Sequence, residues 1–245
     1  MKIPKKVNQV LIVDGLELPD VPPAFARAME SFKTMNPGYE YKLYSGNECR
    51  QWIKTNYNKR YVRLFDTLIP YTFKCDFFRL LLLYKEGGWY CDARQVCLQS
   101  LNHLARTNHE FYAALSKPPA HRDCMESAFM GAVPEHPILK KSIDIICWNI
   151  EHEHYGLDCI YTTGPGVLFQ GAIDYVRRNP TACCIGQVVV IQGNEEYIMF
   201  GGVRFIRRKY NDASGADNSD LKGTNNYGEL WRSWNVYKPK CTQQD

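Results

Sequence analysis

Residues 71–98, YTFKCDFFRLLLLYKEGGWYCDARQVCL, decide the fold because they predict a buried helix followed at once by a strand. Apolar side chains recur there with the period of a helix that faces a core, at Phe73, Phe77, Leu80, Leu81 and Tyr84. The run from Leu80 to Leu83 is apolar all round, which predicts burial on most sides. Gly87 and Gly88 predict the end of the helix, since glycine takes the left-handed C-cap conformation without a steric penalty. Trp89 to Cys91 then has strand character, and Asp92 stands where that strand ends.

Three charged residues are expected to meet at this strand end. Asp76 and Arg79 are three positions apart in the apolar helix, so they share one face, toward Asp92. Charges are costly to bury without partners, so these groups must be satisfied by one another or by something bound. Structural ion-pair networks imitate functional sites, and the spacing alone leaves both interpretations open.

The stretch resembles the core of glycosyltransferase family 32, the sugar transferases with a DXD motif, and more distantly that of the clostridial large glucosylating toxins. The family pattern is roughly K-A/S-D-x-x-R-x-x-x-L-Y-x-x-G-G-x-Y-x-D-x-D. The positions in register here are Lys74, Asp76, Arg79, Leu83, Tyr84, Gly87, Gly88, Tyr90 and Asp92. Arg94 stands where the pattern has its final Asp.

Further segments extend the resemblance over most of the chain, in the family's order. Asn8 replaces the usual His of the opening strand, and Ser127 stands where Asn is common. The His of the closing H-x-W-x-x-S-W motif is not evident; Gly228 and Glu229 lie near its place. The matching segments are IPKKVNQVLI at 3–12, NPGYEYKLYS at 36–45, SAFMGAVPEHPIL at 127–139, TGPG at 163–166 and WRSW at 231–234.

The rest of the chain predicts alternating strands and helices, typical of a three-layer α/β/α fold with a mostly parallel central sheet. Expected strands cover 7–13, 39–44, 110–115, 128–133 and a late hairpin, 187–192 with 197–200; expected helices cover 22–35, 45–52, 137–150 and 165–178. Residues 211–226 are rich in Asp, Asn, Ser and Gly and predict a mobile loop. The resemblance implies the GT-A version of this fold. We expect one domain over 1–245, with a nucleotide-sugar half at about 1–100 and an acceptor half with the C-terminal tail at about 101–245.

Composition excludes some classes of protein. The net charge of +4 over 245 residues is too small to argue for nucleic acid as a partner. No apolar run approaches a membrane span, and no signal peptide or N-glycosylation acceptor is evident, so we expect a cytoplasmic protein without a transmembrane segment. The ten cysteines are then expected to be reduced. Cys147, His152, His154 and Cys159 fit no standard zinc spacing, and a solvated helix end is preferred to a metal site there.

The resemblance also implies roles for individual residues. Asp76, Arg79, Asp92 and Arg94 form the expected catalytic set. Of these, Asp92 is implied to bind the donor's ribose and to help hold a divalent ion, usually Mn²⁺, while Asp76 and Arg79 hold the transferred sugar's hydroxyls and the donor phosphates. Other donor-binding residues are expected at Gln9, Tyr90, Thr163, Gly164, Pro165, Gly166 and Trp234. The turn at 163–166 could present backbone N–H groups to the donor, or it could be a plain helix cap. Aromatic residues Tyr227, Trp231 and Trp234 could stack on the donor, or the tail could pack on the core.

Arg94 is the main departure from the family pattern, and it leaves three functions open. The guanidinium could pair with the donor diphosphate and stand in for the metal, which would give a metal-independent transferase. The site could be degenerate and bind a nucleotide sugar or glycan without turnover. An interaction module on the same fold would bind no nucleotide. We favour catalysis: transfer of a hexose-type sugar from a UDP- or GDP-sugar to a glycan or other hydroxyl acceptor, with the retention of anomeric configuration that the family implies.

Overall fold

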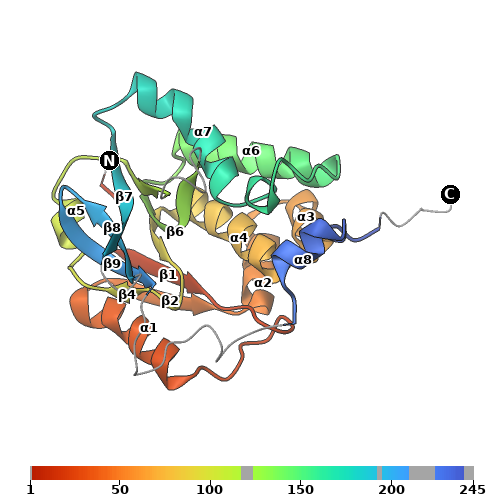
Figure 1. The fold of residues 1–245 in the computed structure, drawn as a ribbon, viewed down its shortest axis with the longest axis horizontal. Coiled ribbons are helices and arrows are strands. Elements are labelled where there is room, and N and C mark those ends of the chain that lie inside the picture. Colours follow the sequence, from red (N-terminus) through yellow and green to blue (C-terminus); the bar gives the residue numbers. More distant parts are fainter. Residues whose placement is uncertain (1, 117–123, 192–194, 210–223, 240–245) are drawn as a thin grey trace.

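Helices cover both faces of a nine-stranded sheet in this computed structural model, which describes residues 2–116, 124–191, 195–209 and 224–239 (Figure 1). The strands are β1 Lys6–Val10, β2 Glu40–Tyr44, β3 Gly88–Cys91, β4 Val96–Cys97, β5 Phe111–Leu115, β6 Met125–Ala132, β7 Cys183–Ile191, β8 Glu195–Phe200 and β9 Val203–Lys209. The helices are α1 Pro23–Met35, α2 Gly46–Asn56, α3 Lys59–Thr67, α4 Tyr71–Glu86, α5 Asn102–Ala105, α6 Pro137–Glu151, the 3-10 turn η1 Cys159–Tyr161, α7 Pro165–Arg178 and α8 Tyr227–Arg232. The predicted loop at 211–226 falls mostly outside the described residues, and so does the turn of the predicted hairpin.

The sheet has the strand order β2-β1-β3-β6-β5-β7-β8-β9-β4. Parallel pairs join β1 to β2, β1 to β3, and β5 to β7, whereas the other five neighbouring pairs are antiparallel. The α/β class is therefore confirmed, but the sheet is mixed and not mostly parallel. The reason is that β7, β8 and β9 follow one another through short connections, which can join only antiparallel strands. The strand β9 and the two-residue β4 were not predicted, and neither were α3, α5 and α8.

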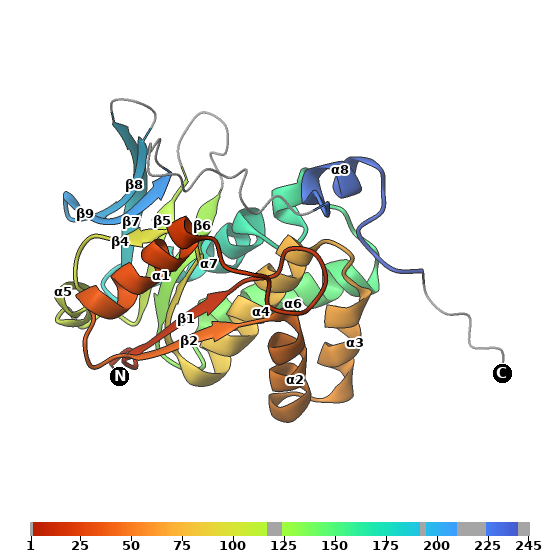
Figure 2. The same cartoon turned by 90° about the horizontal axis from the view of Figure 1, so that it is seen from below.

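Two hydrophobic cores lie on opposite faces of the sheet, which is what makes three layers. Alternate residues of β3 separate them: Trp89 and Cys91 face the core that includes Phe32 of α1, and Tyr90 faces the core built with α4, α6 and α7. Figure 2 shows α1 on one side of β1 and β2 and the larger helical layer on the other. The single sheet takes strands from both predicted halves of the chain, and the division into halves stays a prediction.

Helix α4 is the buried helix that the sequence predicts. Its residues from Phe73 to Leu83 are all buried, and it ends at Gly87, whose φ of 65° is a positive value that glycine adopts without a steric penalty. The C-terminal tail supports the start of α4, because the amide N–H of Tyr71 donates to the side-chain oxygen of Asn225 at 2.8 Å. The helix thereby brings Asp76 and Arg79 to the edge of the sheet where β3 ends.

Candidate active site

A cavity of about 500 Å³ lies at the edge of the sheet where β1, β3 and β5 end. In α/β sheets this edge is where ligands bind. Seven predicted site residues line the cavity: Asp76, Arg79, Tyr90, Asp92, Arg94, Gly164 and Pro165. The opposite wall comes from η1, the start of α7 and Tyr227 of α8. A volume of this size suits a ligand larger than a single sugar.

Asp76 is a buried carboxylate held from three sides. One of its oxygens, Oδ2, accepts a hydrogen bond from Thr163 Oγ1 at 3.0 Å, and the other, Oδ1, lies 3.3 Å from Arg79 Nη2 and 3.5 Å from Ser127 Oγ. Burial raises the pKa of Asp76, and the charge of Arg79 together with the hydrogen bond from Thr163 opposes that rise. The carboxylate is thus fixed in position while its outer edge faces the cavity.

Arg79 links the two aspartates. Its Nη1 donates to the backbone oxygen of Ser127 at 2.8 Å and lies 3.4 Å from Asp92 Oδ1, while its guanidinium lies over the Tyr90 ring at 4.4 Å. Burial favours the neutral form of Arg79, but Tyr90 and the two carboxylates outweigh it and raise the pKa of the guanidinium. The arginine therefore remains charged inside the wall of the cavity.

Asp92 faces the cavity from the end of β3, with a third of its side chain exposed. Its Oδ1 also accepts from the Tyr90 hydroxyl at 3.0 Å. The backbone of Asp92 is fixed as well, because its N–H donates to the oxygen of Ala128 at 2.9 Å and its own oxygen accepts from Gln9 Nε2 at 3.3 Å. The predicted meeting of Asp76, Arg79 and Asp92 is confirmed, and the group is both an ion-pair network and part of a cavity wall.

The turn at 163–166 contributes to the site through the side chain of Thr163 and through the close approach of the Gly164 backbone to Asp76. Thr163 is buried and points at Asp76, and a Cβ on Gly164 would come within 3.1 Å of Asp76 Oδ2, so glycine permits this close approach. Gly166 packs against the Tyr161 ring instead of lining the cavity. Pro165 begins α7 beside the cavity.

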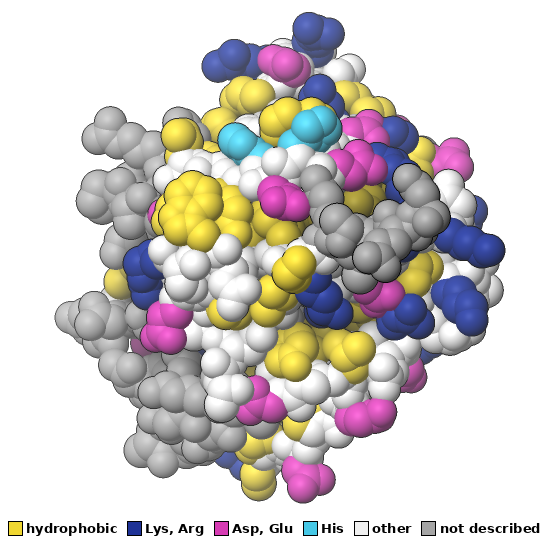
Figure 3. Space-filling model, turned by 90° about the vertical axis from the view of Figure 1, so that its right-hand side faces the viewer, with side chains coloured by type: hydrophobic (Ala, Val, Ile, Leu, Met, Phe, Trp, Pro, Cys, Tyr) yellow, Lys and Arg dark blue, Asp and Glu magenta, His cyan; other side chains and the backbone are white. Residues whose placement is uncertain are grey.

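Besides Thr163 and Gly166, two more predicted donor-binding residues, Gln9 and Trp234, do not line the cavity. Gln9 is fully buried and supports Asp92 from behind, with its Oε1 accepting from the Tyr41 hydroxyl. Trp234 is 74% exposed and packs on Tyr155 at 4.4 Å between ring centroids, while Tyr227 is the tail aromatic in the cavity wall. Figure 3 shows the face that carries α8, where exposed hydrophobic side chains lie among charged ones.

The cavity residues that sequence reasoning missed include Ser116, Glu126 and Arg208, which contact one another. The sequence does contain a feature that could have predicted Glu126: it is the lone charged residue in the apolar run CMESAFMGA, directly before Ser127. No local sequence feature predicts Arg208 as a cavity residue. It reaches the cavity through β9, which pairs with the distant strand β4 as well as with its neighbour β8.

The donor atoms among the described residues do not fit the divalent ion that the resemblance implies. In that part of the chain no three His, Cys, Asp or Glu side chains are grouped closely enough to hold an ion. One oxygen of Asp92 is already engaged by Arg79 and Tyr90, and the next motif position carries the cation Arg94. Hard divalent ions require several oxygen ligands, and this set offers too few.

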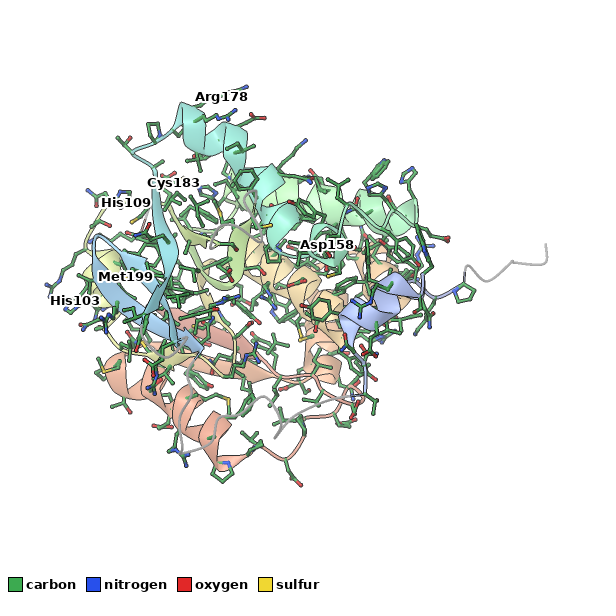
Figure 4. All side chains as sticks on the ribbon, viewed as in Figure 1. His103, His109, Asp158, Arg178, Cys183 and Met199 are labelled. Atoms are coloured by element: carbon green, nitrogen blue, oxygen red, sulfur yellow. The ribbon has the colours of Figure 1, made fainter. Side chains whose placement is uncertain are left out.

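No histidine lies in the cavity wall among the described residues. Figure 4 labels His103, which lies in α5, and His109, which follows that helix; both lie well to the left of Asp158, the residue before η1. The charged groups in the described cavity wall are therefore carboxylates and arginines.

Comparisons with known proteins agree with the family resemblance. A family model described as "Glycosyltransferase sugar-binding region containing DXD motif" matches residues 22–110. A glycosyltransferase of Acanthamoeba polyphaga mimivirus is 24% identical over 73% of this chain and 68% of the viral protein. Inositol phosphoceramide mannosyltransferases 3 and 2 of Schizosaccharomyces pombe are 26% and 28% identical, over 66% and 61% of this chain. The match spans only 43% and 39% of those two enzymes.

Solved structures share the fold. The ligand-free glycosyltransferase domain from the YGT toxin superposes with a TM-score of 0.51 at 9% identity, covering 76% of this chain and 80% of that one. The UDP-bound form of the same domain gives 0.50, also at 9%, over 75% and 79%.

The fold is thus that of GT-A glycosyltransferases, and the resemblance to DXD-motif sugar transferases is confirmed. The class of enzyme is a glycosyltransferase.

Proposed function

We propose that this protein transfers a hexose-type sugar from a UDP- or GDP-sugar to a glycan or other hydroxyl acceptor, with retention of anomeric configuration, as a member of family 32. The observation that carries the proposal is the joint presence of Asp76, Arg79 and Asp92 in one cavity at the carboxyl edge of the sheet. UDP is the first nucleotide to test, because a toxin domain of the same fold has been solved with UDP bound.

Different residues bind different parts of the donor. The exposed edge of Asp92 accepts ribose hydroxyls and the Asp76 carboxylate accepts hydroxyls of the transferred sugar, since ionised carboxylates only accept hydrogen bonds. Departure of the diphosphate leaves negative charge that a site must neutralise. We assign this task to Arg79 and Arg94, which both line the cavity.

Mn²⁺ is the ion that the family resemblance implies, and it would supply the same neutralisation of the diphosphate. Because the described donor set does not fit a divalent ion, we propose that Arg94 takes that task and that transfer proceeds without a metal. We further propose that the chain acts in the cytoplasm. The only direct observation on membranes is that no described helix is long and apolar enough to cross one.

A second candidate function is donor binding without turnover, and Arg94 at the usual metal-ligand position favours it. One assay, the release of UDP or GDP from a nucleotide sugar, distinguishes the two candidate functions. We expect the natural protein to release UDP or GDP from one nucleotide sugar, and release to be accompanied by transfer when a glycan acceptor is present.

Asp76→Asn and Asp92→Asn test the site in the same assay. Each is expected to lower the rate of nucleotide release about 100-fold, which is typical of losing one preorganised electrostatic contact. Asp66→Asn is the matched control, because Asp66 pairs with Arg50 through three hydrogen bonds outside the cavity. Equal rates for all three variants would refute the assignment, and nucleotide binding without release would favour the second candidate.

A further inference from the structure

A second charged cluster, formed by Glu126, Ser116 and Arg208, lies in the wall of the cavity. Glu126 Oε1 accepts from Ser116 Oγ at 2.7 Å, and its Oε2 lies 3.1 Å from Arg208 Nη2. Arg208 also pairs with Glu196 through Nη1. The side chain of Glu126 is only 6% exposed, yet it borders the cavity. A carboxylate has room for about four hydrogen bonds, so this one retains acceptor capacity toward a ligand.

The residues of the cluster come from other strands than the donor residues of β1 and β3. Along the edge of the sheet β1 and β3 come first and carry the residues assigned to the nucleotide, and β6, β5 and β9 follow with Glu126, Ser116 and Arg208. The strand β9 returns to the donor side, because it pairs with β4, which directly follows Asp92 and Arg94. The cluster therefore borders the same cavity as the donor residues, and Glu126 directly precedes Ser127, which contacts both Asp76 and Arg79.

We propose that Glu126, positioned by Ser116 and Arg208, forms the acceptor subsite and binds hydroxyls of a neutral sugar or polyol. This inference rests on the proposed transfer reaction and names its acceptor class. Glu126 and Arg208 together offer an acceptor and a donor of hydrogen bonds, which matches the hydroxyl groups of a sugar.

The charge of the cluster selects against phosphorylated acceptors. Two carboxylates, Glu126 and Glu196, pair with the one guanidinium of Arg208, so these three side chains carry a net charge of about −1. A phosphate placed beside it would meet like charge, whereas a neutral hydroxyl would not. A free polyol and a neutral glycan end carry the same chemistry here, and the acceptor panel distinguishes them.

The test measures sugar transfer and donor hydrolysis in one reaction. Donors are radiolabelled UDP-glucose and GDP-mannose, and acceptors are methyl α-mannoside, methyl α-glucoside, myo-inositol and the 6-phosphates of the two glycosides. We expect neutral acceptors to be used and phosphorylated ones to be at least tenfold poorer. Glu126→Gln is expected to raise the acceptor KM at least tenfold and to lower the ratio of transfer to hydrolysis by a similar factor.

Two further variants show whether an effect of Glu126→Gln comes from the loss of the subsite or from misfolding. Ser116→Ala removes one support of the same carboxylate and is expected to raise the acceptor KM severalfold, and Asp66→Asn is the control outside the cavity. A preference for the phosphorylated glycosides, or a rise in donor KM in place of acceptor KM, overturns the proposal.

Binding of methyl glycosides, measured by saturation-transfer NMR, distinguishes a failure of the proposed transfer function from a failure of the acceptor subsite. If no nucleotide sugar is turned over, the proposed function fails, but glycoside binding that Glu126→Gln abolishes and Asp66→Asn keeps still supports the subsite. Glycoside signals that are absent, or equal in both variants, refute the subsite.

Discussion

Replacing Arg79 with methionine removes the cation that holds the centre of the site together while keeping most of the side-chain volume. The guanidinium contacts Asp76, Asp92 and the backbone oxygen of Ser127, and it is 5% exposed. Asp92 is one-third exposed and can regain water. Asp76 is only 7% exposed and gains much less from water, so the variant leaves one largely buried carboxylate without its charge partner.

The expected cost is about 3–5 kcal/mol in the free energy of unfolding at pH 8, the usual result of removing one member of a buried pair. The cost should shrink in mildly acidic solution. Without Arg79 the pKa of Asp76, already raised by burial, rises further above its unfolded value. The native state then binds more protons than the unfolded state as the pH falls, so the free energy of unfolding of the variant rises relative to that of the natural protein.

Urea denaturation followed by circular dichroism at pH 8 and pH 5.5 measures both effects. The double variant Asp76→Asn/Arg79→Met is the control, because it lacks the Asp76 carboxyl, so its stability deficit should depend much less on pH. A deficit below about 1 kcal/mol at pH 8, or one of the same size at both pH values for Arg79→Met, would refute the buried pair.

Three other predictions concern single contacts. Thr163→Val should cost about 1–3 kcal/mol, because it removes the 3.0 Å hydrogen bond to Asp76, and Thr163→Ser should restore most of it in the same denaturation assay. Burial lowers the pKa of His136 from 6.5 to about 4, so the unfolded state takes up the proton first and the free energy of unfolding should fall by up to about 3 kcal/mol between pH 6.5 and 4. That fall should be absent in His136→Gln, and its persistence there would assign it to other groups. Gly131→Ala should cost about 1–3 kcal/mol, since a Cβ there would overlap the Trp89 ring; an unchanged melting temperature would contradict that packing.

The centre of the site could be predicted from sequence because its signals are local. The helical period, the glycine stop and the three-residue spacing of Asp76 and Arg79 lie within one short segment, and the structure confirms that they meet Asp92. The family resemblance supplied their chemical meaning, which spacing alone left open.

The rest of the site depends on contacts between distant parts of the chain. Thr163 supports Asp76 across 87 positions, and Arg208 reaches Glu126 only because β9 pairs with β8 and β4. No local period predicts such contacts. In the C-terminal tail, the motif WRSW was recognised from the sequence, but the side chain of Trp234 does not line the cavity.

The central claim is that the cavity binds a nucleotide sugar with arginine in place of a metal ion. Its most direct test is a thermal-shift titration with UDP-glucose and GDP-mannose, with and without Mn²⁺, on the natural protein and on Arg94→Asp. One nucleotide sugar at about 100 times its Kd should stabilise the natural protein by about 2.7 kcal/mol, a rise of several degrees in Tm, and Mn²⁺ should add nothing. A shift that requires Mn²⁺ would contradict the role of Arg94. No shift in the natural protein, with Mn²⁺-dependent binding gained in Arg94→Asp, would mean a transferase fold that has lost its donor.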